Sequence, residues 1–237
     1  DGIIPTNADL RKSHIFSFRG DSKYKKFTAM YDISYVTKDA RGVSSGQGGD
    51  GATMFQEIAQ MPVDIPVKAL KDYNSQYHNV DNFYTWYAQN PFWVVANNGN
   101  EYKDDRIYGK IELNLELLRG LNFINRLGGD FTNARQKSWN AVAVPRIGTW
   151  NDGNKSPEPG TYSEYNSYAG QIDYTAYLNA DYQLTTDLRM TGMAGMNYNH
   201  RAGYGINSYL YGLQKPGWYS LLNGADKPVT SSSIYLR

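Results

Sequence analysis

Polar and apolar residues alternate along much of the chain, most clearly between residues 171 and 184. One set of side chains consists of Ile172, Tyr174, Ala176, Leu178, Ala180, Tyr182 and Leu184, and the intervening set consists of Asp173, Thr175, Tyr177, Asn179, Asp181 and Gln183. Successive side chains of a β-strand point to opposite faces of the sheet. A period of two therefore predicts a strand with one apolar and one polar face.

The same alternation recurs in pairs of segments, which predicts three β-hairpins. The first covers about 13–36 with a turn at Gly20-Asp21-Ser22, the second about 107–131 with a turn near Arg119-Gly120, and the third about 171–199 with a turn at Thr185-Thr186-Asp187. We therefore predict an all-β, antiparallel fold of about six long strands. Strands of globular proteins usually have about five or six residues, whereas a strand that crosses a bilayer needs about 9–11.

Three much longer segments, about 38–105, 135–167 and 203–237, are predicted to be loops. Loops longer than about 12–15 residues are uncommon in compact soluble domains. Short turns at one end of the strands and long extracellular loops at the other end are typical of outer-membrane β-barrels.

The polar faces of the predicted strands are rich in charged residues, among them Lys110, Glu112 and Arg126. A soluble β-sandwich exposes such faces to water and packs its apolar faces on a second sheet, whereas a transmembrane barrel exposes its apolar face to lipid. The sequence offers no second set of strands, which favours the barrel. Six strands are too few to close a membrane barrel, which needs about eight, so we expect residues 1–237 to be part of one larger barrel domain.

Composition excludes several other classes of protein. The 237 residues include 24 basic and 23 acidic side chains, so the chain lacks the basic excess of a nucleic-acid-binding protein. There is no cysteine, which excludes disulfides and thiol catalysis, and three scattered histidines lack the spacing of metal ligands. The 21 tyrosines and 23 glycines are typical of an all-β protein with long polar loops.

Two local patterns resemble chemical motifs. Residues 46–51 read G-x-G-x-x-G, but polar residues separate them from the preceding strand, whereas a dinucleotide site needs a buried strand directly before its glycines. Asp152, Asn154 and Ser156 have part of the spacing of a calcium loop, and both a polar loop tip and a weak ion site remain open. With no catalytic constellation in view, we predict no enzyme activity, no cofactor and no metal site.

Aromatic residues gather in or beside the long connections, among them Trp86, Trp93, Trp150, Tyr165 and Trp218. Such side chains either pack the loops and form an interfacial girdle, or they offer a stacking surface for sugar rings or peptides. We take these five as candidate contact residues.

Seven short segments follow one another along nearly the whole chain: GIIPTNADLRK (2–12), MPVDIPV (61–67), NPFWVV (90–95), DRIYGKIELNLEL (105–117), LNFINRLGGDF (121–131), YTAYLNADYQL (174–184) and KPGWYSLLNG (215–224). In this order they resemble the SusC/RagA family of TonB-dependent outer-membrane transporters of Bacteroidetes-type bacteria. The Asn-Pro-aromatic-Trp element, the Asp-Arg that opens a strand and the Pro-Gly-x-Tyr-Ser-Leu-x-Asn segment carry most of the resemblance.

The resemblance implies a barrel of about 22 strands with a separate N-terminal plug, of which residues 1–237 would be a middle part without the plug. It implies active import of oligosaccharides or oligopeptides, energised by the TonB complex through the plug. It also implies an outer-membrane location and a SusD-like surface lipoprotein that covers the extracellular loops. In such a barrel Arg126, Asp130, Asp173, Asn179 and Arg189 would face the lumen, and the five loop aromatics would contact substrate or lipoprotein.

A soluble carbohydrate-binding β-sandwich is the alternative reading of the same features. It explains the alternation and the aromatic loops. It differs from the barrel because it requires shorter strands, of about six residues, and a second sheet.

Overall fold

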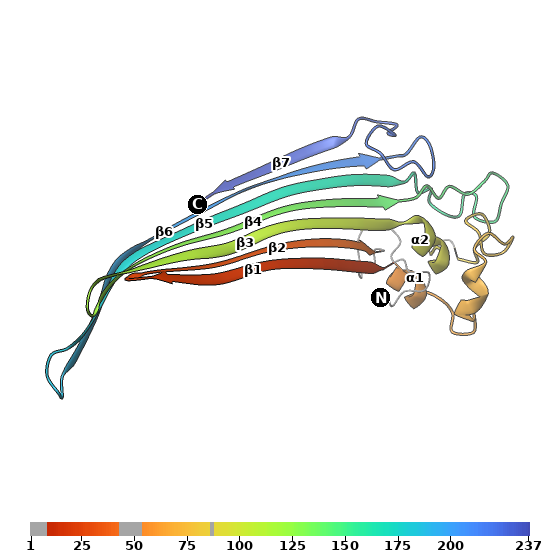
Figure 1. The fold of residues 1–237 in the computed structure, drawn as a ribbon. Helices are drawn as coiled ribbons and strands as arrows, with labels where there is room; N and C mark the ends of the chain where they lie inside the picture. Colours follow the sequence, from red (N-terminus) through yellow and green to blue (C-terminus); the bar gives the residue numbers. More distant parts are fainter. Residues whose placement is uncertain (1–8, 43–53, 86–87) are drawn as a thin grey trace.

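Seven strands of the described residues form one antiparallel sheet, in which every strand pairs with its neighbours in sequence (Figure 1). The computed structural model describes residues 9–42, 54–85 and 88–237. The strands are β1 (Leu10–Tyr24), β2 (Phe27–Gly42), β3 (Gly99–Leu118), β4 (Leu121–Asn140), β5 (Thr161–Gln183), β6 (Arg189–Tyr211) and β7 (Val229–Leu236). The short helices α1 (Met54–Ala59), η2 (Val67–Lys71) and α2 (Pro91–Asn97) lie between β2 and β3. None of these helices has the length and apolar character needed to span a bilayer.

The all-β prediction and two of the three predicted turns are confirmed. The β3–β4 hairpin turns at Arg119 and Gly120, where Gly120 has a φ of 85° that favours glycine. The β5–β6 hairpin turns between Leu184 and Leu188, whose backbone groups hydrogen-bond each other over 2.9 Å.

The first hairpin turns later than predicted. β1 continues through Gly20 to Tyr24, and Lys25 and Lys26 form the turn. Gly20 lies within the strand because the ring of Tyr31 covers it: a Cβ atom at Gly20 would stand 2.4 Å from the Tyr31 hydroxyl oxygen. A glycine that suggests a turn in the sequence here makes room for a cross-strand aromatic ring.

The strands reach farther into the predicted loops than expected. The long connections cover 43–98, 141–160 and 212–228, and the last predicted loop contains β7, a seventh strand beyond the six predicted. Tyr165 therefore lies in β5 and not in a loop. Near the outer ends the regular alternation fades, as in residues 132–140 of β4, although backbone pairing continues.

One face of the sheet, the apolar face, carries a band of apolar side chains next to the short turns. The hydrogen-bonded register places Tyr31, Ile111, Leu127, Tyr174 and Tyr198 of five successive strands in one row of this band. No other described element covers the band, and Leu127 is 50% exposed. On β3 the band covers the 11 residues Ile107–Leu117, and on β4 the 11 residues Leu121–Phe131, which is the length that crosses a bilayer.

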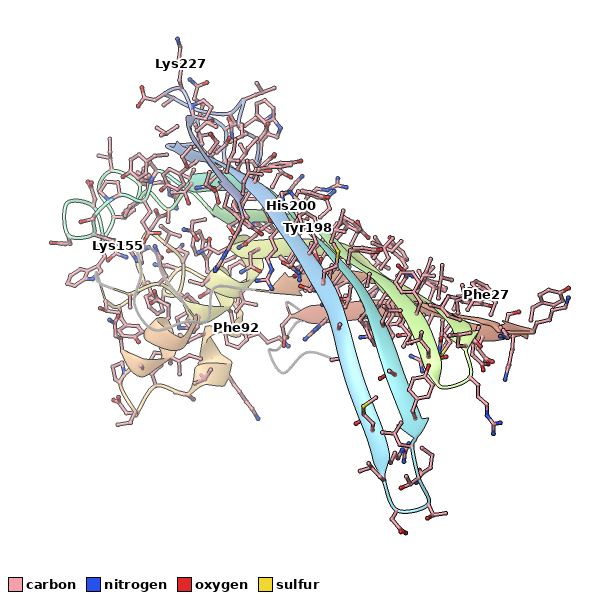
Figure 2. The ribbon with its side chains drawn as sticks, turned by 90° about the vertical axis from the view of Figure 1, so that its left-hand side faces the viewer. Phe27, Phe92, Lys155, Tyr198, His200 and Lys227 are labelled. Atoms are coloured by element: carbon pink, nitrogen blue, oxygen red, sulfur yellow. The ribbon has the colours of Figure 1, made fainter. Side chains whose placement is uncertain are left out.

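Each hairpin extends farther along the strand direction than the hairpin before it. β3 extends three residues beyond Leu115, the partner of Phe27 at the first turn, and β5 extends three residues beyond Ala180, the partner of Leu121 at the second turn. The β5–β6 hairpin consequently projects farthest (Figures 1 and 2). Each step moves the turn by three residues of about 3.3 Å along the strand and by two strand spacings of about 4.8 Å across the sheet. If the turns lie in one plane parallel to the membrane, this ratio corresponds to a strand tilt of about 45°. Membrane barrels have this tilt.

At the opposite end of the strands, the long connections pack into two apolar clusters. One contains the buried residues Leu70, Phe83 and Ala88, and the other contains Tyr162, Leu210 and Leu213. The carbonyl oxygen of Asn97, at the end of α2, joins neighbouring segments because it accepts hydrogen bonds from Trp139 Nε1 and from the Tyr219 hydroxyl, each 3.0 Å long. The connections are therefore tied to one another and to the strand ends.

We predict that Gly109→Ala disrupts the β2–β3 pairing, whereas Gly128→Ala is tolerated. A Cβ atom at Gly109 would stand 2.3 Å from the backbone oxygen of Asp32, so the backbone must shift, whereas the nearest atom to a Cβ at Gly128 is 3.8 Å away. Thermal unfolding of the intact protein, followed by β-sheet circular dichroism, measures the difference. Equal midpoints for the two variants would contradict the close approach at Gly109.

Candidate functional site

The five polar residues predicted to face a lumen lie on one face of the sheet. Side-chain alternation and the strand register place them opposite the apolar band, on what is called here the polar face: Arg126 and Asp130 on β4, Asp173 and Asn179 on β5, and Arg189 on β6.

Ion pairs between neighbouring strands cross the polar face. Arg106 binds Asp130 with two hydrogen bonds, including a 2.8 Å bond from Nε, and Arg126 Nε donates to Glu112 over 2.8 Å. Two further pairs join hairpin strands: Arg19 lies 2.9 Å from Asp32, and Arg189 Nε donates to Asp181 over 2.7 Å. Paired arginine and carboxylate groups link strands and satisfy most of the charge on this face.

Asp173 differs from these residues because the groups that donate hydrogen bonds to it are neutral. Its carboxylate accepts hydrogen bonds from the side-chain amides of Asn197 (3.2 Å) and Asn199 (3.1 Å) and from the Thr175 hydroxyl (3.3 Å). Asn179 lies between Asn122 and Met193 in the register, and its side chain forms no hydrogen bond with the described residues.

A shallow depression of about 390 Å³ lies in the middle of the polar face. Gly128 is one of the residues that line it, and in the register Gly128 stands between Lys110 of β3 and Asp173 of β5. Sequence reasoning placed Lys110 on the polar face but did not single out the depression, because a glycine in an alternating strand gives no indication of which side chains flank it.

The five candidate aromatic residues do not form one surface. Trp86 lies outside the described residues. Trp93 is partly buried in α2, Trp150 and Trp218 are 58% and 47% exposed in two different connections, and Tyr165 lies on β5. Among the described residues, no two of these five rings stack on each other.

The two motif-like segments have different outcomes. Residues 46–51 lie outside the described residues. The side chains of the calcium-like segment stabilise a turn: Asp152 accepts a 2.8 Å hydrogen bond from the Gly148 amide, and Asn154 donates a 2.7 Å bond to the Trp150 carbonyl.

A buried polar junction between two long connections was not predicted from the sequence. Glu57 of α1 accepts a short hydrogen bond from the Gln89 amide, Lys155 donates a 2.6 Å bond to the Ala88 carbonyl, and the Gln89 side chain donates to Glu158 over 3.1 Å. Asn151 donates to the carbonyls of Val80 and Phe83. The junction holds segment 54–90 against segment 141–160.

Burial shifts the pKa values of Glu57 and Lys155 in this junction toward 7. Loss of hydration raises the pKa of Glu57 to about 7, although the Gln89 amide and Lys155 oppose the shift. Loss of hydration also lowers the pKa of Lys155 to about 8, against the opposing effect of Glu158 and Glu57.

No model of a known protein family and no curated protein sequence matches the chain. Solved structures of the RagAB peptide importer in its closed-closed and open-open states match the fold with TM-scores of 0.66 and 0.69, at 15% and 14% sequence identity. A further structure of the RagAB peptide transporter matches with a TM-score of 0.65 at 15% identity. The alignments cover 95–96% of this chain and 25% of the matched chain. The chain therefore spans a quarter of that length and shares the fold of one part of a β-barrel transporter.

We predict that the loop junction loosens as the pH rises from about 4.5 to 7. The folded junction keeps the Glu57 proton in this range and the opened junction releases it, so the contact loses stability until Glu57 is ionised in both states. Above about pH 8 the junction gains stability as the pH rises further. The folded junction releases the Lys155 proton at a lower pH than the opened junction does.

Hydrogen exchange around the Gln89 amide, corrected for the intrinsic pH dependence, measures this effect. Protection falls toward pH 7 in the wild type, and Glu57→Gln removes that fall. A fall of the same size in the Glu57→Gln variant would show that another group is responsible.

Proposed function

We propose that this chain forms part of the barrel wall of a SusC/RagA-type importer in the bacterial outer membrane. In this proposal the importer is energised by TonB through a plug domain, acts with a SusD-like surface lipoprotein, and carries oligopeptides or oligosaccharides without changing them chemically. The observation that carries the proposal is the apolar band, which lies on one face of a single sheet and is uncovered.

The dimensions of the band fit a bilayer. Eleven residues of about 3.3 Å each, tilted by about 45°, rise by about 25 Å, which is the height of the apolar belt of outer-membrane barrels. A soluble β-sandwich would need a second sheet over this band, and the described residues form one sheet. The geometry therefore favours lipid as the cover.

The two edges of the sheet support a larger barrel. In the described residues β1 and β7 each pair with one neighbour, so each presents a row of unpaired backbone groups on its other side. Such groups cost several kcal/mol each in hydrocarbon, and only further strands can satisfy them in a membrane. The paired charges of the polar face then line a wet interior.

Features at the end of the sheet that carries the long connections support the proposed contact with a lipoprotein. Beyond the band the regular alternation of the strands fades, and the connections above them are packed and hydrogen-bonded. Trp150 and Trp218 remain exposed there, as aromatic anchors of a protein interface would be before the partner binds.

Fractionation of the native source tests the proposal directly. Mass spectrometry of the intact polypeptide is expected to find a species of roughly 100 kDa in the outer-membrane fraction, as a barrel of about 22 strands with a plug requires, together with a co-purifying lipoprotein. A soluble monomer at the 26.8 kDa of this sequence would overturn the proposal in favour of a β-sandwich binder.

We predict that an arginine destabilises the protein when it is placed on the apolar face of β4 and is tolerated on the polar face. Leu127→Arg places a charge near the middle of the band and is expected to cost about 2–4 kcal/mol of folding stability in a bilayer. Asn122→Arg, on the polar face of the same strand and opposite Glu116, is expected to cost less than about 1 kcal/mol.

Urea unfolding of the intact protein in phospholipid vesicles measures both values. Equal stability of the two variants would show that lipid does not contact the apolar band.

A further inference from the structure

We propose that the apolar face of β3 and β4 carries a binding site for a phosphorylated lipid of the outer leaflet, in which Lys103 and Arg135 hold the phosphate and an apolar groove beneath them holds an acyl chain. The inference rests on the proposed function, because it takes the apolar band to face lipid and the long connections to be extracellular. It concerns the lipid-facing side of the sheet and not the polar face.

Two cations stand directly opposite each other on the apolar face, just beyond the band. The register pairs Lys103 of β3 with Arg135 of β4, and it pairs Arg135 with Asn166 of β5 on the other side. Lys103 and Arg135 are the one pair of like charges in the register of β3 with β4, both of which lie wholly within the described residues. Like charges directly opposite each other destabilise a sheet, so this position favours an anion between the two side chains.

The groups around the two cations leave most of this charge unbalanced. Arg135 and Asn166 are both exposed, and neither forms an ion pair or a hydrogen bond with the described residues. Lys103 has one ionic partner, the Asp39 carboxylate at 4.0 Å, and these two side chains are 62% and 58% exposed. Because an exposed pair of this kind contributes little energy, Lys103 remains available to a stronger anion.

The adjacent row of the same strands has balanced charges. It lies closer to the long connections and consists of Arg41, Glu101, Lys137 and Glu164, which alternate in sign from β2 to β5. Each cation in that row therefore stands beside an anion. The row of Lys103 differs because it places two cations side by side, followed by a neutral amide.

The height of the two cations matches the headgroup layer of a bilayer. Lys103 lies four residues before Ile107, where the band begins on β3. At about 3.3 Å per residue and a tilt of about 45°, it stands about 9 Å beyond the band, and headgroups extend about 5–8 Å beyond the hydrocarbon. Long basic side chains reach across the difference. The stacked rings of Tyr168 and Tyr204 occupy the row between the cations and the band, where aromatic belts lie.

An apolar groove lies below the cations on the same two strands. Gly109 and Gly129 stand opposite each other within the band, and a hollow of about 260 Å³ remains above them, flanked by apolar side chains such as Leu127 and Phe131. Gly109 is six residues from Lys103, which places it about 14 Å deeper and within one leaflet of a bilayer about 40–45 Å thick. The groove therefore favours a lipid over a free phosphate ion as the ligand.

Native mass spectrometry of the purified intact protein in detergent tests the site. The probes are monophosphoryl lipid A, the same lipid without its phosphate, and inorganic phosphate. We expect the wild type to bind the phosphorylated lipid at least about tenfold more tightly than the dephosphorylated lipid, because charge-assisted hydrogen bonds are the stronger ones. Inorganic phosphate at the same concentration should not displace the lipid. Equal binding of the two lipids, or displacement by inorganic phosphate, would overturn the lipid site.

Single substitutions locate the phosphate contact. Lys103→Gln and Arg135→Gln should each weaken binding of the phosphorylated lipid about tenfold and leave binding of the dephosphorylated lipid unchanged. Lys137→Gln is the matched control: it removes one positive charge from the same strand and face, but Lys137 stands between Glu101 and Glu164, so this variant should bind like the wild type. An equal loss of binding in the control would show a general effect of net charge and no site.

Thermal unfolding in detergent, with and without the phosphorylated lipid, gives an independent test. Without the lipid, Arg135→Gln should unfold at the same temperature as the wild type or at a higher one, because the substitution removes a repulsion. With the lipid, the wild type should gain stability and the variant should not. A variant that is equally destabilised in both conditions would show that Arg135 supports the fold and not a lipid. A protein that fractionates with the outer membrane and fails these tests keeps its proposed transporter function without the lipid site, whereas a soluble protein overturns both.

Discussion

The antiparallel register of the strands is the constraint on which the rest of the structure depends. A slip of one residue between two strands would move every side chain of one strand to the opposite face. The register that puts Leu127 beside Ile111 and Tyr174 in the apolar band also puts Arg126 beside Glu112 on the polar face. The band and the ion pairs therefore specify the same alignment, and each strand contributes to both surfaces at once.

Much of this architecture can be predicted from the sequence because a period of two is a local property. The strand cores, the turns at Gly120 and at 184–188, and the common face of Arg126, Asp130, Asp173, Asn179 and Arg189 follow from alternation alone. The strand ends and β7 do not, because apolar and polar residues do not alternate regularly there and backbone pairing defines them. Gly20 could not be placed in a strand without knowing that Tyr31 lies across from it.

The candidate sites were less predictable, because they depend on contacts between distant segments. The alternation of side chains indicates that Lys110 and Asp173 share a face, but it does not show that they stand on either side of Gly128. The junction of Glu57 with Gln89 and Lys155 joins residues from two connections whose packing leaves no periodic pattern. The Asn-Pro pair at the start of α2 is an exception: Asn90 caps the helix by accepting from the Phe92 amide, which is a local signature.

The ion pairs of the polar face contribute to the stability of the sheet. A single sheet has no core behind its polar face, so cross-strand pairs such as Arg106 with Asp130 supply part of the rigidity that a second layer would provide. Side chains used in this way are saturated and offer little to a ligand. Lys110 differs from these paired residues, because it forms no ion pair or hydrogen bond with the described residues.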